Sequence, residues 1–325
     1  MSETVVELDA VAFEGGSRVV ARHGSMSAHC FRYSTGVPGL RIESDDTVVE
    51  LLPYQGQQVW RGSYGGRELT MRSMFDEPRP TGAYLDTYGA LLIHCGALAM
   101  GNPGSADDHP LHGELPNAPY RRARLVAGTD ADGDYVVLAG EYEHATAFGH
   151  HYLAEPRLTV RARGGALRSR MAIRGLGHRP MPLMYLAHVN FAPVDGARLV
   201  DSSGTDESIV AGERIDPEQV TERHLRPGAD GWAYSLQLHP TGVADFVRHR
   251  PVELGHTLRW LVRDGDQDAL GLALPATAGV QGFTRESEKG RVRRLARGES
   301  FCSTIEFGAL TGAEAETFLA RAGHA

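Results

Sequence analysis

The chain has almost no lysine, few cysteines and no long apolar run, and each shortage argues against a class of function. Lys289 is the only lysine among 325 residues, so Schiff-base chemistry and lysine-dependent phosphate binding have little support. The three cysteines are far apart, which argues against a disulfide framework or a thiolate zinc site and predicts three buried thiols. No stretch approaches the roughly 20 apolar residues of a membrane span, and residues 1–5 lack the pattern of a signal peptide.

Strong positive charge and the common nucleotide and hydrolase motifs are also missing. The net charge is −8 and the isoelectric point is about 6.0, which disfavours a nucleic-acid-binding protein. We find no phosphate-binding loop, no H-E-x-x-H, no G-x-S-x-G and no dinucleotide fingerprint. With 42% hydrophobic and 23% charged residues, the composition is that of a globular protein. We therefore expect a cytoplasmic protein with neither a nucleic-acid nor a membrane partner, while the oligomeric state stays open.

Short alternating apolar patterns predict strands along most of the chain. Between Leu158 and Leu176, apolar residues alternate with polar residues, mostly arginine, on both sides of Gly164-Gly165, which predicts a hairpin with one solvated face. The other predicted strands are Thr47–Pro53, Gln57–Trp60, Tyr135–Glu141, Leu183–Phe191, Thr257–Val262, Ala269–Leu274, Val292–Leu295 and Phe301–Phe307.

The 39 glycines, the 17 prolines and the scarcity of helical patterns indicate an all-β fold. We expect a single domain over residues 1–325, built as a large antiparallel β-sandwich. The polar stretches 102–109 and 201–230 are interpreted as long loops over the sandwich rather than as linkers. One short helix is predicted at Ala313–Ala322.

Two segments carry residues suited to chemistry. His112 lies in a loop rich in proline and glycine, next to the carboxylate of Glu114. In the predicted strand around residues 184–191, His188 and Asn190 share one face, where a buried imidazole and amide need hydrogen-bond partners or a ligand. Each histidine also has a structural interpretation, as a capping residue in the loop or a satisfied core residue in the strand.

Together these segments resemble the galactose mutarotase-like superfamily, the aldose 1-epimerases and their relatives. The resemblance extends over about residues 45–310 and is closest to a poorly characterised branch of that superfamily. It is carried by Tyr54-Gln-Gly-Gln-Gln58 with Trp60, by His94-Cys95-Gly96, by Leu111-His112-Gly113 with Asn117, and by Pro182-Leu-Met-Tyr-Leu-Ala-His188-Val-Asn190-Phe191. It implies a large β-sandwich with a sugar-binding cleft on one face, and hence a small carbohydrate as the partner.

The resemblance also implies roles for individual residues. Anomer interconversion opens a hemiacetal ring, which needs a base at the anomeric hydroxyl and an acid at the ring oxygen. His188 matches the histidine that acts as the acid, and His112 matches the one that assists near the ring oxygen. Arg72 is a candidate for clamping sugar hydroxyls. The remaining substrate-binding candidates are His94, Asn190, Trp60 and Glu114.

The chain departs from the family at the base. The glutamate that serves as base there lies on a strand near the C-terminus, and Leu274 stands at the matching position. A leucine cannot take a proton, so we expect the base to be displaced, with Glu286 as the first candidate and Glu288, Glu306 and Glu114 as alternatives. The missing glutamate also leaves open that the protein binds sugar without turning it over.

A metal site is a further alternative. His94, His109, His112 and His188 could converge with Glu114 on a divalent ion, although the spacing is not that of a firm metal motif. Such an ion would suit an isomerase or lyase that acts on an oxidised sugar. The leading expectation is an aldose 1-epimerase-like isomerase without a cofactor.

Overall fold

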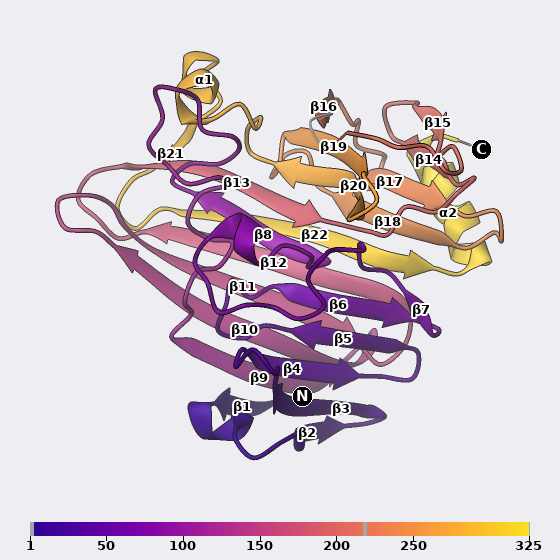
Figure 1. Cartoon of the computed structure of the whole chain (residues 1–325), viewed down its shortest axis with the longest axis horizontal. Coiled ribbons are helices and arrows are strands. Elements are labelled where there is room, and N and C mark those ends of the chain that lie inside the picture. The colour runs from indigo at the N-terminus through magenta and orange to yellow at the C-terminus, as the bar shows by residue number, and fades with distance from the viewer. Residues whose placement is uncertain (1–2, 217–219, 325) are drawn as a thin grey trace.

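The computed structural model describes residues 3–216 and 220–324, which form two large antiparallel sheets packed face to face (Figure 1). One sheet has ten strands. In spatial order they are β1 (Thr4–Leu8), β9 (Arg122–Asp130), β10 (Gly133–Ala145), β11 (His151–Arg161), β12 (Gly165–Gly175), β22 (Ser300–Leu310), β18 (Ala244–His249), β17 (Ala233–Leu238), β14 (Arg198–Asp201) and β15 (Asp206–Ser208).

The other sheet has twelve strands. Its main path runs through β16 (Val220–Arg223), β19 (His256–Arg263), β20 (Asp268–Ala276), β13 (Met181–Val189), β8 (Leu92–Ala97), β6 (Val59–Tyr64), β5 (Thr47–Leu51), β4 (Pro38–Glu43), β3 (Met26–Arg32) and β2 (Arg18–His23). Off this path, β21 (Arg293–Leu295) pairs with β13, and β7 (Arg67–Glu68) pairs with β6. This arrangement confirms the all-β sandwich expected from the sequence.

Helices are few and short. In the described residues, 3₁₀ turns cover Ala10–Phe13 and Tyr84–Asp86, and the α-helices are α1 (Phe283–Glu288) and α2 (Gly312–Ala322). Thr311 and Glu314 form a capping box at the start of α2, and Gly323 ends it in a left-handed conformation, as such residues do at helix termini. Within the part of the chain that the structure describes, no helix is long and apolar enough to cross a membrane.

The predicted hairpin shows why alternation specifies a strand here. On β12, Leu167, Met171 and Ile173 are buried, whereas Arg168 and Arg170 between them are exposed. Because successive side chains of a strand point to opposite faces, the apolar set enters the sandwich and the arginines meet solvent.

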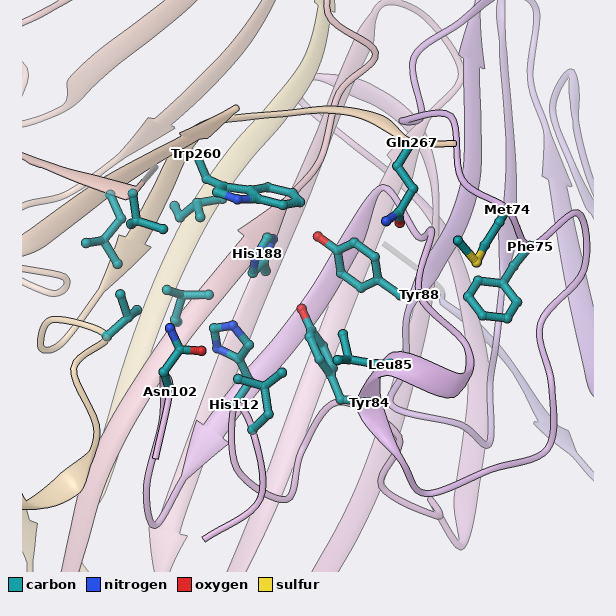
Figure 2. Close-up of a pocket in the computed structure, with 16 residues that line it drawn as sticks. Met74, Phe75, Tyr84, Leu85, Tyr88, Asn102, His112, His188, Trp260 and Gln267 are labelled. Atoms are coloured by element: carbon teal, nitrogen blue, oxygen red, sulfur yellow. The ribbon is translucent and has the colours of Figure 1, made fainter. Parts of the chain in front are cut away.

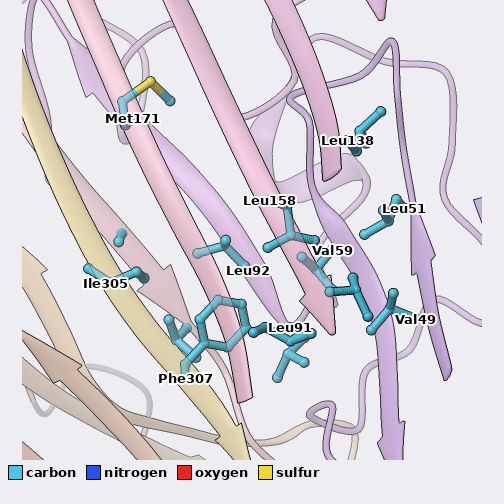
Figure 3. Close-up of a cluster of buried hydrophobic side chains, with 14 of the residues drawn as sticks. Val49, Leu51, Val59, Leu91, Leu92, Leu138, Leu158, Met171, Ile305 and Phe307 are labelled. Atoms are coloured by element: carbon cyan, nitrogen blue, oxygen red, sulfur yellow. The ribbon is translucent and has the colours of Figure 1, made fainter. Parts of the chain in front are cut away.

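The core between the sheets is contributed by both of them (Figure 3). Val49 and Leu51 come from β5 of the twelve-stranded sheet, and they face a cluster that includes Leu158 from β11 and Phe307 from β22. Each is at most 6% exposed, and burying a side chain of this size contributes about 1.5–3 kcal/mol.

Strand β13 lies in the middle of the twelve-stranded sheet and is buried on both faces. Tyr185, Ala187 and Val189 belong to the core between the sheets. Leu186 belongs to a second apolar cluster on the outer face, which is covered by the long segments 71–91 and 98–118. His188 shares that outer face, so the strand presents it to whatever lies between the sheet and these segments.

Several sequence predictions need correction. The stretch 201–230 is not one loop, since it contains β15 and β16, and α1 was not expected. Strands β1 to β4, β7 to β9, β14, β17 and β18 were also not predicted, although β1 has the same five residues, Thr-Val-Val-Glu-Leu, as the predicted β5. Cys30 and Cys95 are buried as predicted, but Cys302 is exposed. The strand predicted from Gln57 begins at Val59.

Candidate active site

A cavity of about 420 Å³ opens on the outer face of the twelve-stranded sheet (Figure 2). Strands β13, β19 and β20 contribute its floor, and the segments around residues 74–88 and 102–112 form its walls. The volume is within the range of about 300–1,000 Å³ found for small-molecule sites. The fold therefore supplies one concave site bordered by the two histidines singled out in the sequence.

Five ring side chains form a closed circuit around this cavity. Successive ring centroids are 5.5 Å apart for His112–His188, 5.8 Å for His188–Trp260, 6.1 Å for Trp260–Tyr88, 5.3 Å for Tyr88–Tyr84 and 5.0 Å for Tyr84–His112. The two imidazoles are nearly perpendicular, at 88°. Figure 2 shows His188 and His112 turned toward one another, with Trp260 above and the two tyrosines beside them.

His188 reaches this circuit from the middle of β13. Its side chain is 5% exposed, and its Nδ1 is buried without a hydrogen-bond partner. Burial lowers the pKa of His188 to about 4, although a hydrogen bond with Asn190 opposes the shift. Asn190 in turn accepts a hydrogen bond from the Tyr88 hydroxyl at 3.4 Å and donates one to the Ala90 carbonyl at 3.1 Å. The ring is therefore neutral at neutral pH.

His112 is held by its own backbone in the opposing wall. Its N–H donates to the Gly101 carbonyl at 3.1 Å, and its carbonyl accepts from Gly96 at 2.9 Å. Its φ of +59° lies in the left-handed region, which non-glycine residues adopt at an energetic cost. Burial lowers the pKa of His112 to about 3, and the charges of the nearby His188 and His109 make smaller contributions in the same direction. Its Nδ1, like that of His188, has no hydrogen-bond partner.

The strained backbone at His112 makes a testable prediction. In His112→Gly and His112→Ala the ring is lost equally, but only alanine keeps the Cβ that disfavours positive φ. We expect the glycine variant to be more stable than the alanine variant by about 1 kcal/mol, the reverse of the usual order. Urea unfolding of the two variants measures this difference, and an alanine variant as stable as the glycine variant would contradict it.

Other residues of the resemblance motifs act as anchors for the walls. Gln58 and Gln55 donate to the Asn117 side-chain oxygen at 2.9 Å and 3.2 Å, and Asn117 donates to the carbonyl of Ala83 at 3.2 Å. This network fixes the segment that carries Tyr84. Glu114 accepts hydrogen bonds from the backbone of residues 97 and 98 and from the Tyr152 hydroxyl, which fixes the loop that carries His112.

The cavity carries no formal charge among the described residues that line it. Nine of its sixteen lining side chains are aliphatic, Met or Phe, three are Tyr or Trp, and the remaining four are His112, His188, Asn102 and Gln267. Leu274 is among the nine. Leu274 and His188 line the cavity from the neighbouring strands β20 and β13.

None of the five predicted substrate-binding residues lines the cavity: Asn190 is fully buried, Glu114 anchors the His112 loop, and the other three lie elsewhere. The Arg72 guanidinium is half exposed and binds Asp268, at 3.1 Å, and the Gly265 carbonyl. His94 is on the opposite face of the sheet from His188, where its Nδ1 lies 2.7 Å from the Tyr185 hydroxyl. Trp60 is fully buried in the outer apolar cluster, and the Arg61 guanidinium lies 4.9 Å from its ring centroid.

None of the four candidate glutamates lines the cavity. Glu286 on α1 is fully buried and accepts hydrogen bonds from Lys289, from Arg291 and from the backbone of Gly279. Glu306 lies on the other sheet, paired with Arg168 and Arg248. Glu288 is exposed on α1, and Glu114 is bound as described above.

The four histidines considered for a metal do not come together. His109 lies near the start of α1, with its Nε2 3.3 Å from the Phe283 amide and 3.8 Å from the Asp107 carboxylate, and His94 is on the far face of the sheet. Over residues 3–216 and 220–324, no group of three or more His, Cys, Asp or Glu side chains is placed to hold a metal ion.

The sequence did not single out most of the aromatic and amide side chains in the site. Tyr84 and Tyr88 lie in an irregular segment without periodicity, and Asn102 and Gln267 lie in loops. Trp260 is the tryptophan that lines the cavity, and a signal for it was present. Leu258 and Trp260 alternate on the predicted strand 257–262, and both line the cavity from β19.

Comparison with known proteins places the fold. The structure is similar to that of a Klebsiella pneumoniae protein described as a "putative aldose 1-epimerase", with a TM-score of 0.87 at 16% identity over 99% of this chain and 95% of that one. It is also similar to a galactose mutarotase-like protein from Clostridium acetobutylicum, with a TM-score of 0.60 at 13% identity over 87% of this chain and 98% of that one. No curated protein matches.

The protein therefore has the galactose mutarotase-like β-sandwich fold, as the sequence motifs indicated. Residues 34–205, more than half of the chain, match the family described as a domain of unknown function (DUF4432). The chain belongs to that family.

Proposed function

We propose that the protein is an aldose 1-epimerase-like isomerase that interconverts the anomers of a monosaccharide bound in this cavity against His112 and His188. One observation carries the proposal. Two neutral imidazoles from separate elements have ring centroids 5.5 Å apart in a cavity of about 420 Å³, each with a buried Nδ1 that no protein group satisfies. Other buried side chains of the described chain, such as His249, also have a polar atom without a partner, but His112 and His188 share this feature with Tyr84 in one cavity, where a bound sugar can supply the missing partners.

The chemistry needs one proton carrier and one hydrogen-bond donor. Neutral His188 takes the proton of the anomeric hydroxyl and, as imidazolium, delivers it to the ring oxygen. The bond between the anomeric carbon and the ring oxygen breaks as the carbonyl forms. Rotation about the adjacent carbon–carbon bond and reversal of these steps give the other anomer. The neutral His112 ring donates a hydrogen bond to the oxygen that carries negative charge during the transfer.

This assignment gives the proton transfers to the histidines rather than to a displaced glutamate. A general base must come within hydrogen-bond reach of its proton, and Glu286 is already engaged by Lys289 and Arg291 outside the cavity. A second candidate function is sugar binding without turnover, which is favoured by Leu274 at the position where the resembling epimerases carry their base.

Exchange spectroscopy of sugar anomers by proton NMR tests the proposal. With a panel of pentoses, hexoses and deoxy sugars, we expect at least one sugar to exchange faster than in buffer, at a rate unchanged by a chelator. A rate abolished by the chelator would indicate a metal-assisted enzyme. Saturable binding with exchange at the buffer rate for all sugars would indicate the binding protein instead.

A further inference from the structure

We infer that the site selects uncharged sugars whose exocyclic carbon is a methyl group, the 6-deoxyhexoses, over the parent hexoses and the uronic acids. The inference rests on the proposed function for the orientation of the sugar. It follows from what surrounds His188 on the sheet and from the absence of charge among the described lining residues.

The described lining of the cavity is uncharged. None of the described side chains that line the cavity is Arg, Lys, Asp or Glu. A carboxylate or phosphate on the sugar would lose its hydration in the cavity without gaining a counter-charge, and the effective cost for an unpaired buried ion is several kcal/mol. The cavity therefore matches a sugar without ionised substituents.

A hydrocarbon surface lines the same cavity as His188. Leu186, Leu258 and Leu274, on three neighbouring strands, are at most 3% exposed and line the same cavity, and Val280 extends this surface. Leu258 pairs with Leu274, and Leu274 lines the same cavity as His188 from the strand next to β13. A hydroxyl placed against these side chains has no partner, whereas a methyl group is removed from water there.

The geometry of a pyranose determines which groups flank its ring oxygen. Its ring oxygen is bonded to the anomeric carbon and to the carbon that bears the exocyclic group. In the proposed mechanism the ring oxygen lies at His188 and the anomeric hydroxyl lies within reach of both imidazoles. The other carbon bonded to the ring oxygen, which bears the exocyclic group, then faces Leu274. The opposite orientation would place the anomeric hydroxyl, which must lose its proton, against a leucine.

The mouth of the cavity is also apolar. Met74 is 61% exposed, Leu85 is 62% exposed and Val220 is 38% exposed, and these are three of the nine large hydrophobic side chains recorded as exposed in the described chain. Figure 2 shows Met74 and Leu85 on the far side of the tyrosines from His188. The floor and the mouth of the cavity are both hydrocarbon. The side chains that can form hydrogen bonds with a sugar are therefore those of the five-ring circuit and the amides of Asn102 and Gln267.

The test compares sugars that differ only at the sixth carbon. In the galacto and gluco series, the dissociation constants of the 6-deoxyhexose, the parent hexose and the uronate are measured by titration calorimetry, and anomer exchange is measured by NMR. In at least one series we expect the 6-deoxyhexose to bind about tenfold or more tightly than the parent hexose, and the uronate to show no saturation. Leu274→Gln, which offers an amide to a hydroxyl, is expected to narrow this preference.

The control is Leu261→Gln, a half-buried leucine of β19 that packs toward the core and does not line the cavity; it is expected to keep the wild-type preference. The inference is overturned if the hexose or the uronate binds as tightly as the 6-deoxyhexose in both series, or if no 6-deoxyhexose binds. Selective binding of the 6-deoxyhexose without anomer exchange would support the inference about selectivity and contradict the proposed isomerase activity. Equal exchange of all three sugars would support the isomerase activity and contradict the inference about selectivity. The comparison among sugars on the wild-type protein holds even if a variant fails to fold.

Discussion

Replacing His188 with glutamine is expected to lower the rate of anomer exchange by two to four orders of magnitude while the sandwich stays folded. Glutamine keeps a polar side chain at a position that is 5% exposed, but it cannot take a proton from the anomeric hydroxyl or deliver one to the ring oxygen. Proton transfer by a positioned histidine contributes about 10²–10⁴ in rate. The measurement is kcat from exchange NMR, with circular dichroism as the check on folding.

The matched control for this experiment is His249→Gln. His249 is as deeply buried as His188, with 1% exposure, and it lies on β18 of the other sheet, outside the cavity. Its replacement is expected to lower stability but to leave kcat within about twofold of the wild type. If both variants lose activity equally, or if His188→Gln keeps it, His188 is not the proton carrier.

Acid is expected to unfold this protein at an unusually high pH, because four buried histidines remain neutral in the fold. Burial lowers the pKa to about 4 for His94 and His188 and to about 3 for His112 and His249. In the unfolded chain each histidine has a pKa of about 6.5. Between these values the unfolded state binds protons that the folded state does not. The free energy of unfolding therefore has its full value above about pH 6.5 and falls as the pH is lowered.

The size of this effect rivals the whole stability of a typical fold. At pH 5 each of the four rings is worth about 2 kcal/mol of lost stability, or about 8 kcal/mol together, against a usual total of about 5–15 kcal/mol. The carboxylates with lowered pKa values, such as Asp107 at about 2, begin to contribute only below about pH 5. The window from pH 7 to pH 5 therefore isolates the histidines.

Urea unfolding at pH 7 and at pH 5 measures this loss. In His249→Gln, the difference in unfolding free energy between the two pH values is expected to be smaller by about 2 kcal/mol, whatever its stability at pH 7. His224→Gln serves as the control, because His224 is exposed and its replacement should leave the difference unchanged. An equal pH dependence in all three proteins would mean that the buried rings titrate as they do in water.

The strands that build the floor of the site could be predicted from the sequence because their pattern is local. The alternation around residues 158–176 and 184–191 fixes which side chains enter the core, and it placed His188 on a separate face from Tyr185. The short motifs then identified the superfamily fold. The same motifs also pointed to Leu274, which lines the same cavity as His188.

The walls of the site could not be predicted in this way. Tyr84 and Tyr88 owe their positions to hydrogen bonds over long sequence distances, such as Asn117 to the Ala83 carbonyl and Tyr88 to Asn190. The alternation of apolar and polar residues along the sequence does not reveal such contacts. Residue type alone likewise could not separate Trp60, which is in the apolar cluster, from Trp260, which lines the cavity.

The central claim is that two uncharged imidazoles face a sugar in this cavity, and nitrogen-15 NMR of the histidine rings tests it most directly. The rings of His112 and His188, assigned through His112→Gly and His188→Gln, are expected to stay neutral from pH 8 down to about pH 5.5. Both sets of ring signals are expected to shift when a sugar saturates the cavity. Titration of both rings near pH 6.5, or ring signals that no sugar perturbs, would contradict the account.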